Sequence, residues 1–350
     1  MQTIFDGHND VLLRLWQNQK AGGDAVDEFA RGTTDGHIDA PRARLGHLAG
    51  GFCAIYIPSG DIHLKRPDAL GHYETPLATP LERPPSLDIA LQKAAIALRL
   101  HQAGAWRLCR STDDIRRAMA DGVFAAVLHM EGCEAIDRDL SALEVFYAAG
   151  LRSLGPVWSR HNLFGHGVPF AFPKSPDTGP GLTEAGFDLV RACNRLGIVI
   201  DLAHITEQGF WDVARISDQP LVASHSNAHA LTPVARNLTD RQMDAIRDTG
   251  GLAGLNFAVT MLRPDGQENP DTPLSDMIRH VDYMVNRMGI DCVAIGSDFD
   301  GATIPSVIGD ASGLPRFVEA LKAAGYEGEA LDKLCRKNWL RILAKAWKES

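Results

Sequence analysis

The sequence lacks the segments that would place it in or across a membrane. None of its apolar runs approaches the roughly 20 residues that a helix needs to cross a bilayer. Residues 2–8 have neither the basic region nor the apolar core of a secretion signal. The six cysteines are widely scattered and form no CxxC pair, so we expect buried free thiols and no disulfides. We therefore expect a cytoplasmic protein without a membrane anchor.

The chain also lacks an excess of positive charge. It has 35 Lys and Arg against 44 Asp and Glu, which gives a formal net charge of −9. This balance argues against nucleic acid or an anionic membrane as the main partner. Apolar residues make up 45% of the 350 residues and charged residues 23%, as in ordinary globular proteins.

Short apolar runs alternate with helical patterns along the whole chain. They contain mainly Val, Ile, Leu and Ala with little polar alternation, which is typical of parallel strands buried on both faces. The eight runs lie at residues 3–6, 51–57, 124–129, 151–157, 197–202, 221–224, 252–257 and 292–296. This alternation predicts an α/β fold, a (β/α)8 TIM barrel. A doubly wound sheet is the alternative, but no GxGxxG turn follows the first strand.

We expect residues 1–350 to form a single barrel domain, with a C-terminal helix from about residue 331. Ser111-x-x-Asp114 and Thr239-x-x-Gln242 have the pattern of capping boxes, and Thr183 is a third candidate cap. Three long polar or Gly- and Pro-rich segments follow predicted strands and are expected as loops on the catalytic face, at residues 18–50, 59–85 and 165–181.

The ends of the predicted strands carry histidines and carboxylates. Active sites of such barrels lie where the strands end, so these side chains are expected at one rim. Five strands contribute to the set, which comprises His8, Asp10, Glu131, His204, His225, Asp298 and Asp300. We expect Asp300 to be structural or to support its neighbours.

Imidazole and carboxylate groups are ligands for Zn²⁺, Mn²⁺ or Fe²⁺. The set exceeds what one catalytic zinc needs, and it fits two metals about 3.5–4 Å apart that share a carboxylate. A hydroxide that bridges two such metals is a strong nucleophile for hydrolysis at neutral pH. A free carboxylate nearby would then transfer a proton to the leaving amine, and Asp298 suits that role.

Several motifs resemble the renal (membrane) dipeptidase family of binuclear zinc peptidases, and the chain looks like a bacterial-type member. The resemblance covers nearly the whole chain, and the order and spacing of the motifs make it specific. The motifs are "DGHND" (6–10), "DAPR" (39–42), "HMEG" (129–132), "NRLGIVIDLAH" (194–204), "SHSNAHAL" (224–231), Arg236-Asn237 and "GSDFDG" (296–301).

The resemblance implies a role for each matching residue. His8 and Asp10 would ligate the first metal, and Glu131 would bridge both metals. His204 and His225 would ligate the second metal. Asp298 corresponds to the catalytic aspartate of the family. Arg236 corresponds to the arginine that holds the C-terminal carboxylate of the substrate, for which a guanidinium is well shaped.

One position departs from the family pattern. The family has a histidine after the fourth strand that contacts the substrate carbonyl oxygen, and "GLRSLGPVWSRHN" (150–162) places Trp158 there. His161 and His166 lie close in sequence, and we expect His161 to replace the missing donor. The alternative is that Trp158 forms a flat apolar wall of the pocket and neither histidine contacts the substrate.

The expected function is hydrolysis of the peptide bond of dipeptides at two Zn²⁺ ions, with other divalent ions and a D-residue at the C-terminal side left open. One alternative is a barrel amidohydrolase acting on N-acyl amino acids or cyclic amides, but those usually begin with HxH and have a carbamylated lysine where Glu131 stands. The other is a catalytically idle metal-binding relative, which would show a broken ligand set. The expected partners are small dipeptides, and a homodimer is left open.

Overall fold

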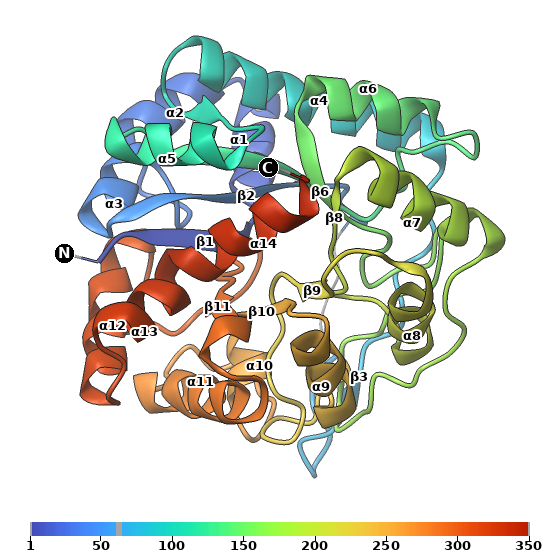
Figure 1. Cartoon of the computed structure of the whole chain (residues 1–350), viewed down its shortest axis with the longest axis vertical. Helices are drawn as coiled ribbons and strands as arrows, with labels where there is room; N and C mark the ends of the chain where they lie inside the picture. Colours follow the sequence, from blue (N-terminus) through green and yellow to red (C-terminus); the bar gives the residue numbers. More distant parts are fainter. Residues whose placement is uncertain (1, 61–64, 349–350) are drawn as a thin grey trace.

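The computed structural model describes residues 2–60 and 65–348. Parallel strands form the centre of the molecule, and helices surround them (Figure 1). In order around the barrel the strands are β1 (Ile4–Asn9), β2 (Leu48–Tyr56), β5 (Ala125–Glu131), β6 (Leu151–Gly155), β8 (Val199–Ile200), β9 (Val222–Ala223), β10 (Leu252–Leu255) and β11 (Val293–Ile295). This arrangement confirms the predicted (β/α)8 barrel.

Single bridges close the barrel at two seams. β8 and β9 meet through Asp201 and Val222, and the end of β1 meets the chain after β11 through Asn9 and Phe299. At this second seam the Asp6 carboxylate accepts hydrogen bonds from the backbone N (2.7 Å) and the hydroxyl (2.8 Å) of Ser297. These two hydrogen bonds between Asp6 and Ser297, called the Asp6–Ser297 latch below, therefore support the seam where few backbone pairs join the strands.

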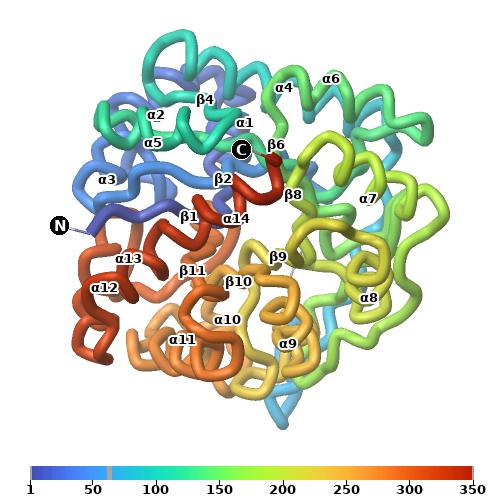
Figure 2. Tube along the Cα trace, in the orientation of Figure 1, coloured from blue at the N-terminus to red at the C-terminus, as the bar shows by residue number. Residues whose placement is uncertain are grey.

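The helices follow the strands around the barrel in chain order, as the continuous change of colour in Figure 2 shows. They are α1 (Val11–Lys20), α2 (Ala25–Arg31), α3 (Ala40–Leu45), α4 (Arg83–Gln102), α5 (Thr112–Ala120), α6 (Ser141–Ala149), α7 (Glu184–Leu196), α8 (Glu207–Ile216), α9 (Asp240–Asp248), α10 (Val259–Leu262), α11 (Leu274–Met288), α12 (Leu314–Ala323), α13 (Gly328–Asp332) and α14 (Asn338–Ala346). The other strands of the described chain have two residues each and are not part of the barrel order. They are β3 (Tyr73–Glu74), β4 (Arg107–Leu108) and β7 (Ala171–Phe172).

The C-terminal helical segment begins at Gly328 and includes a π-helical turn between α13 and α14. α14 lies across the barrel strands (Figure 1). Its Trp339 is fully buried, packs against Phe52 and donates a hydrogen bond to the carbonyl oxygen of Ile295 at 2.8 Å. The indole thus fills the barrel interior opposite the rim that carries the predicted site.

Local signals explain several helix starts and one difference from expectation. Capping boxes form at Ser111 and Thr239, and Thr183 caps α7, as predicted. The segment 18–50, expected as a loop, contains the helices α2 and α3. Asp24 and Asp39 cap these helices by accepting backbone N–H bonds, which is the usual role of aspartate at this position.

All six cysteines are buried and free, as expected. Among the described residues, no helix combines the length and the apolar character that a bilayer crossing would require. The loop after β2 pairs with the loop after β6 through β3 and β7, which are antiparallel. These loops therefore lie together above the strand ends.

Candidate metal centre

The five predicted metal ligands converge at one end of the barrel. His8 and Glu131 stand on β1 and β5, whereas His204 and His225 lie in the segments that follow β8 and β9. The Glu131 Oε1 atom lies 3.0 Å from His204 Nε2, 3.5 Å from His225 Nε2 and 3.6 Å from His8 Nε2. Asp10 Oδ2 lies 3.3 Å from His8 Nε2. Two overlapping groups of three ligands therefore share Glu131, as a bridging carboxylate would.

Hydroxyl groups orient the rings of two histidines. His225 Nδ1 lies 2.7 Å from Ser224 Oγ, and that hydroxyl donates its proton to Asp201 Oδ2 at 2.6 Å. The imidazole must then donate from Nδ1, which leaves the Nε2 lone pair directed toward Glu131. His204 Nδ1 has a similar partner in Ser159 Oγ at 2.8 Å. Such partners fix the ring orientation that a metal ligand needs.

The protonation of these histidines suits a cation. Burial lowers the pKa of His204 and His225 well below the usual range, and the nearby charges of Arg236 and His8 lower it further. Both rings are therefore neutral at physiological pH, with lone pairs available to a metal.

The acids of the site are buried close to the positive charges of His8 and Arg236. Burial raises the pKa of Glu131 and Asp298 because a charged carboxylate loses its hydration there. Asp10 Oδ1 is buried without a hydrogen-bond partner among the described residues. A divalent cation would add positive charge beside these carboxylates and supply the missing contact to Asp10. The donor set, three imidazoles and two carboxylates, therefore fits zinc or a similar ion.

A cavity of about 1010 Å³ opens above these ligands. Asp10, Glu131 and His204 line its floor together with Asp298. Trp158 forms part of its wall, with its ring centroid 5.6 Å from that of His204. The space is ample for a dipeptide-sized molecule next to the ligand atoms.

Asp298 lies at the cavity floor after β11. Its Oδ2 accepts a hydrogen bond from Asn256 at 2.9 Å. A Cβ at Gly301 would come within 2.5 Å of Asp298 Oδ1 and 2.3 Å of Asp10 Oδ2, so this close approach of two carboxylates requires glycine. Asp300 also lines the cavity, and its carboxylate accepts a hydrogen bond from the backbone N of His37 at 2.6 Å.

Arg236 is buried next to His225 and, among the described residues, is not one of those that line the cavity. Its guanidinium donates to the His225 carbonyl oxygen (3.2 Å) and to Ser226 Oγ (3.4 Å), and its Nε has no hydrogen-bond partner among the described residues. Burial lowers its pKa to about 10, so it is still charged at neutral pH. The nearby carboxylates of Asp298 and Glu131 favour that charge.

His161 lies apart from this group. Within the described part of the chain it is not among the residues that line the cavity, and its ring packs against His166 with centroids 4.6 Å apart. Trp158, in contrast, contacts Tyr56 and Phe170 as an aromatic wall. His129 pairs with Ser153 Oγ at 2.9 Å and packs against His8, so it supports the ring of a candidate ligand.

The sequence interpretation did not single out several supporting residues, namely Ser159, Asp201, Ser224 and Asn256. Three of them lie next to predicted strand ends, and Asp201 and Ser224 stand inside quoted motifs. The available signal was a polar residue at the end of an apolar strand. That signal does not reveal the partner, because the partner comes from a neighbouring strand.

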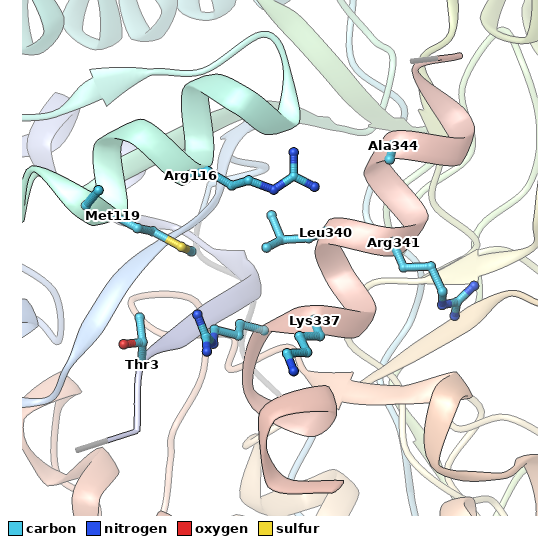
Figure 3. Close-up of a pocket in the computed structure, with 9 residues that line it drawn as sticks. Thr3, Arg116, Met119, Lys337, Leu340, Arg341 and Ala344 are labelled. Atoms are coloured by element: carbon cyan, nitrogen blue, oxygen red, sulfur yellow. The ribbon is translucent and has the colours of Figure 1, made fainter. Parts of the chain in front are cut away.

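A second cavity, of about 660 Å³, lies between α5 and α14 (Figure 3). Arg116, Arg336, Lys337 and Arg341 line it. Each already has partners: Arg116, Arg336 and Lys337 pair with nearby carboxylates, and Arg341 donates to backbone carbonyls. Protein groups therefore hold these cations, although Arg336 Nε has no hydrogen-bond partner among the described residues.

Comparisons with known proteins agree with this geometry. The structure of a metallopeptidase from Rhodobacter sphaeroides, liganded with a phosphinate mimic of the dipeptide L-Ala-D-Ala, matches with a TM-score of 0.95 and 47% identity, over 99% of both chains. An uncharacterised protein from the pqqA 5′ region of Klebsiella pneumoniae is 52% identical over 75% of this chain and 98% of its own. The dipeptidase tcpJ of Claviceps purpurea is 29% identical over 97% of this chain and 76% of its own.

The sequence model of one family matches residues 1–349, which is nearly the entire chain. Its description is membrane dipeptidase, peptidase family M19. The resemblance inferred from the motifs is thereby confirmed, and so is the expectation of an enzyme. The chain belongs to the membrane dipeptidase family of metallopeptidases and is a dipeptide-hydrolysing enzyme.

Proposed function

We propose that this enzyme is a binuclear zinc dipeptidase whose first ion is held by His8, Asp10 and Glu131. The second ion would be held by Glu131, His204 and His225. The observation that carries the proposal is the single Glu131 oxygen within 3.6 Å of three imidazole Nε2 atoms. When bound, two such ions polarise the scissile carbonyl and generate a nucleophile from water at neutral pH.

Asp298 is the proposed general acid and base. It lines the same cavity as Asp10, Glu131 and His204, and burial raises its pKa above that of an exposed carboxyl. A carboxyl at this place can serve as the proton carrier that hydrolysis requires. Asn256 holds its Oδ2, which leaves Oδ1 beside Gly301 for proton transfer at the cavity floor.

Arg236 is the proposed partner of the substrate's C-terminal carboxylate. Its guanidinium has a buried Nε without a protein partner, and a carboxylate can accept two parallel bonds from such a group. Trp158 would form the apolar wall against which a side chain packs. The role of His161 as the oxyanion donor stays a prediction. Its ring packs against His166, and it is not among the described residues that line the cavity.

We further propose that the C-terminal residue of the substrate can be a D-residue. The Rhodobacter sphaeroides relative, 47% identical, was solved with a mimic of L-Ala-D-Ala. The test is an assay of Ala-Ala in both stereochemical forms at the C-terminal residue, with zinc measured on the same sample. We expect cleavage of the dipeptide with D-Ala at its C-terminal end, and about two zinc equivalents per chain. A fully active sample with one zinc equivalent per chain would contradict the two-ion assignment.

The role of Asp298 is tested by Asp298→Asn. This change keeps the hydrogen bond to Asn256 but removes the proton-carrying group, so turnover should fall by about two to four orders of magnitude while zinc stays bound. Asp300→Asn is the matched control, since Asp300 bonds to the backbone of His37. Equal activity of Asp298→Asn and the control would rule out the proposed role.

A further inference from the structure

A buried ion pair stands behind the aromatic wall of the cavity. The side chains of Arg160 and Glu134 are both fully shielded from solvent, and Arg160 Nε lies 3.0 Å from Glu134 Oε1. A buried guanidinium is costly to dehydrate unless its donors are satisfied. Here its other two nitrogens bond to Ser59 Oγ and to the carbonyl oxygen of Ile57 (3.1 Å).

These contacts connect three loops at the barrel rim. Ile57 and Ser59 follow β2, Glu134 follows β5, and Arg160 follows β6. The loops are distant in sequence, and the guanidinium is a rigid fork that imposes a fixed geometry on its acceptors. The side chain of Arg160 therefore anchors its own loop to two neighbouring ones.

The anchored loop contains the cavity wall. Arg160 closes a tight turn by donating its backbone N–H to the Trp158 carbonyl oxygen at 2.6 Å. Its guanidinium also lies over the Trp158 ring, 5.4 Å from the centroid. The indole also contacts Tyr56 and Phe170. The position of the indole above His204 thus depends on where Arg160 is held.

We propose that Arg160, paired with Glu134, is a positioning residue that sets substrate selectivity by fixing Trp158 in the cavity wall. This inference rests on the proposed dipeptidase function. Arg160 does not line the cavity among the described residues, so it acts through the indole and not by touching the substrate. Loss of the fork should let the wall shift and change which side-chain sizes fit.

The test compares kcat and KM for Ala-Ala, Leu-Ala and Ala-Leu. Arg160→Lys keeps the charge but loses the fork, and the pair Arg160→Met with Glu134→Gln removes both charges together. In both variants we expect the kcat/KM of either Leu-Ala or Ala-Leu, relative to that of Ala-Ala, to change about tenfold. This is the effect on kcat/KM that a changed contact with an apolar side chain typically has. Arg287→Lys is the matched control, because Arg287 also makes a fork, to Asp244, but on α11 away from the cavity.

A double-mutant cycle separates positioning from a general structural role. If Arg160 acts through Trp158, Arg160→Lys should leave selectivity unchanged in a Trp158→Ala background. Equal losses for all three dipeptides, or full additivity with Trp158→Ala, would overturn the proposal. So would loss of bound metal in Arg160→Lys, since Arg160 would then act on His204 through Ser159. If the unmodified protein cleaves no dipeptide, the proposed function fails instead.

Discussion

Two residues of the candidate site have an unusual backbone conformation. His204 and Asp298 adopt positive φ angles, 66° and 59°, which few residues other than glycine occupy. Such strain is typical of functional positions, where the surrounding structure holds the residue in place. The local turn at each of these residues directs its side chain toward Glu131 and the cavity. The alternation of side chains along a regular strand would not produce this direction by itself. The chemistry of the site thus depends on single backbone angles as well as on side-chain identity.

Arg236 provides a prediction at this scale. Arg236→Ala should raise KM for free dipeptides by roughly 10- to 150-fold, because hydrogen bonds to a charged group contribute about 1.5–3 kcal/mol. Dipeptide amides lack the carboxylate and should show a much smaller effect. Steady-state kinetics on both substrate classes measures this difference. An equal increase for both would exclude Arg236 as the carboxylate partner.

At the scale of elements, the seam between β1 and β11 is one of the two places where a single backbone bridge joins neighbouring strands of the barrel wall. A single backbone bridge joins Asn9 and Phe299, whereas β2 and β5 pair along seven residues each. The Asp6 carboxylate compensates by accepting from Ser297. The seam matters for function because His8 and Asp298 stand on its two sides.

Ser297→Ala should therefore destabilise the protein. It removes one donor from the buried Asp6 carboxylate, and such a loss costs about 1–3 kcal/mol. The measurement is the urea midpoint of unfolding with zinc present. Ser306→Ala is the control, because Ser306 is exposed and its hydroxyl donates to the Pro270 carbonyl oxygen at the surface. This change should shift stability by no more than about 0.5 kcal/mol. Equal midpoints for the two variants would contradict the role of the Asp6–Ser297 latch.

At the scale of the whole molecule, the proposed metal ligands come from four separate parts of the barrel. They follow or end β1, β5, β8 and β9, so bound ions would connect strands that are far apart in sequence. Anything that binds the folded state in preference to the unfolded chain stabilises it. The proposed ions would therefore also help to hold the rim together.

Chelation should lower the thermal unfolding temperature as well as abolish hydrolysis. At free metal 1,000-fold above its Kd, each site contributes about 4 kcal/mol of stability. Differential scanning calorimetry with and without chelator measures the shift, and added zinc should reverse it. In the His8→Ala variant, the chelator should lower the unfolding temperature by less, because this variant has already lost a ligand of the first proposed metal site. An unchanged unfolding temperature would argue against structural coupling of the ions.

The sequence by itself determined the barrel, the family and the identity of the candidate ligands. Apolar runs, capping residues and strand-end motifs are local signals, and they repeat in a recognisable order. Only the tertiary structure decided how the side chains meet. The Ser224–Asp201 and Asn256–Asp298 contacts join neighbouring strands, and the Arg160–Glu134 pair joins loops, so no local pattern predicts them. The place of His161 beside His166, away from the cavity lining, likewise follows from the packing of its loop against neighbouring segments.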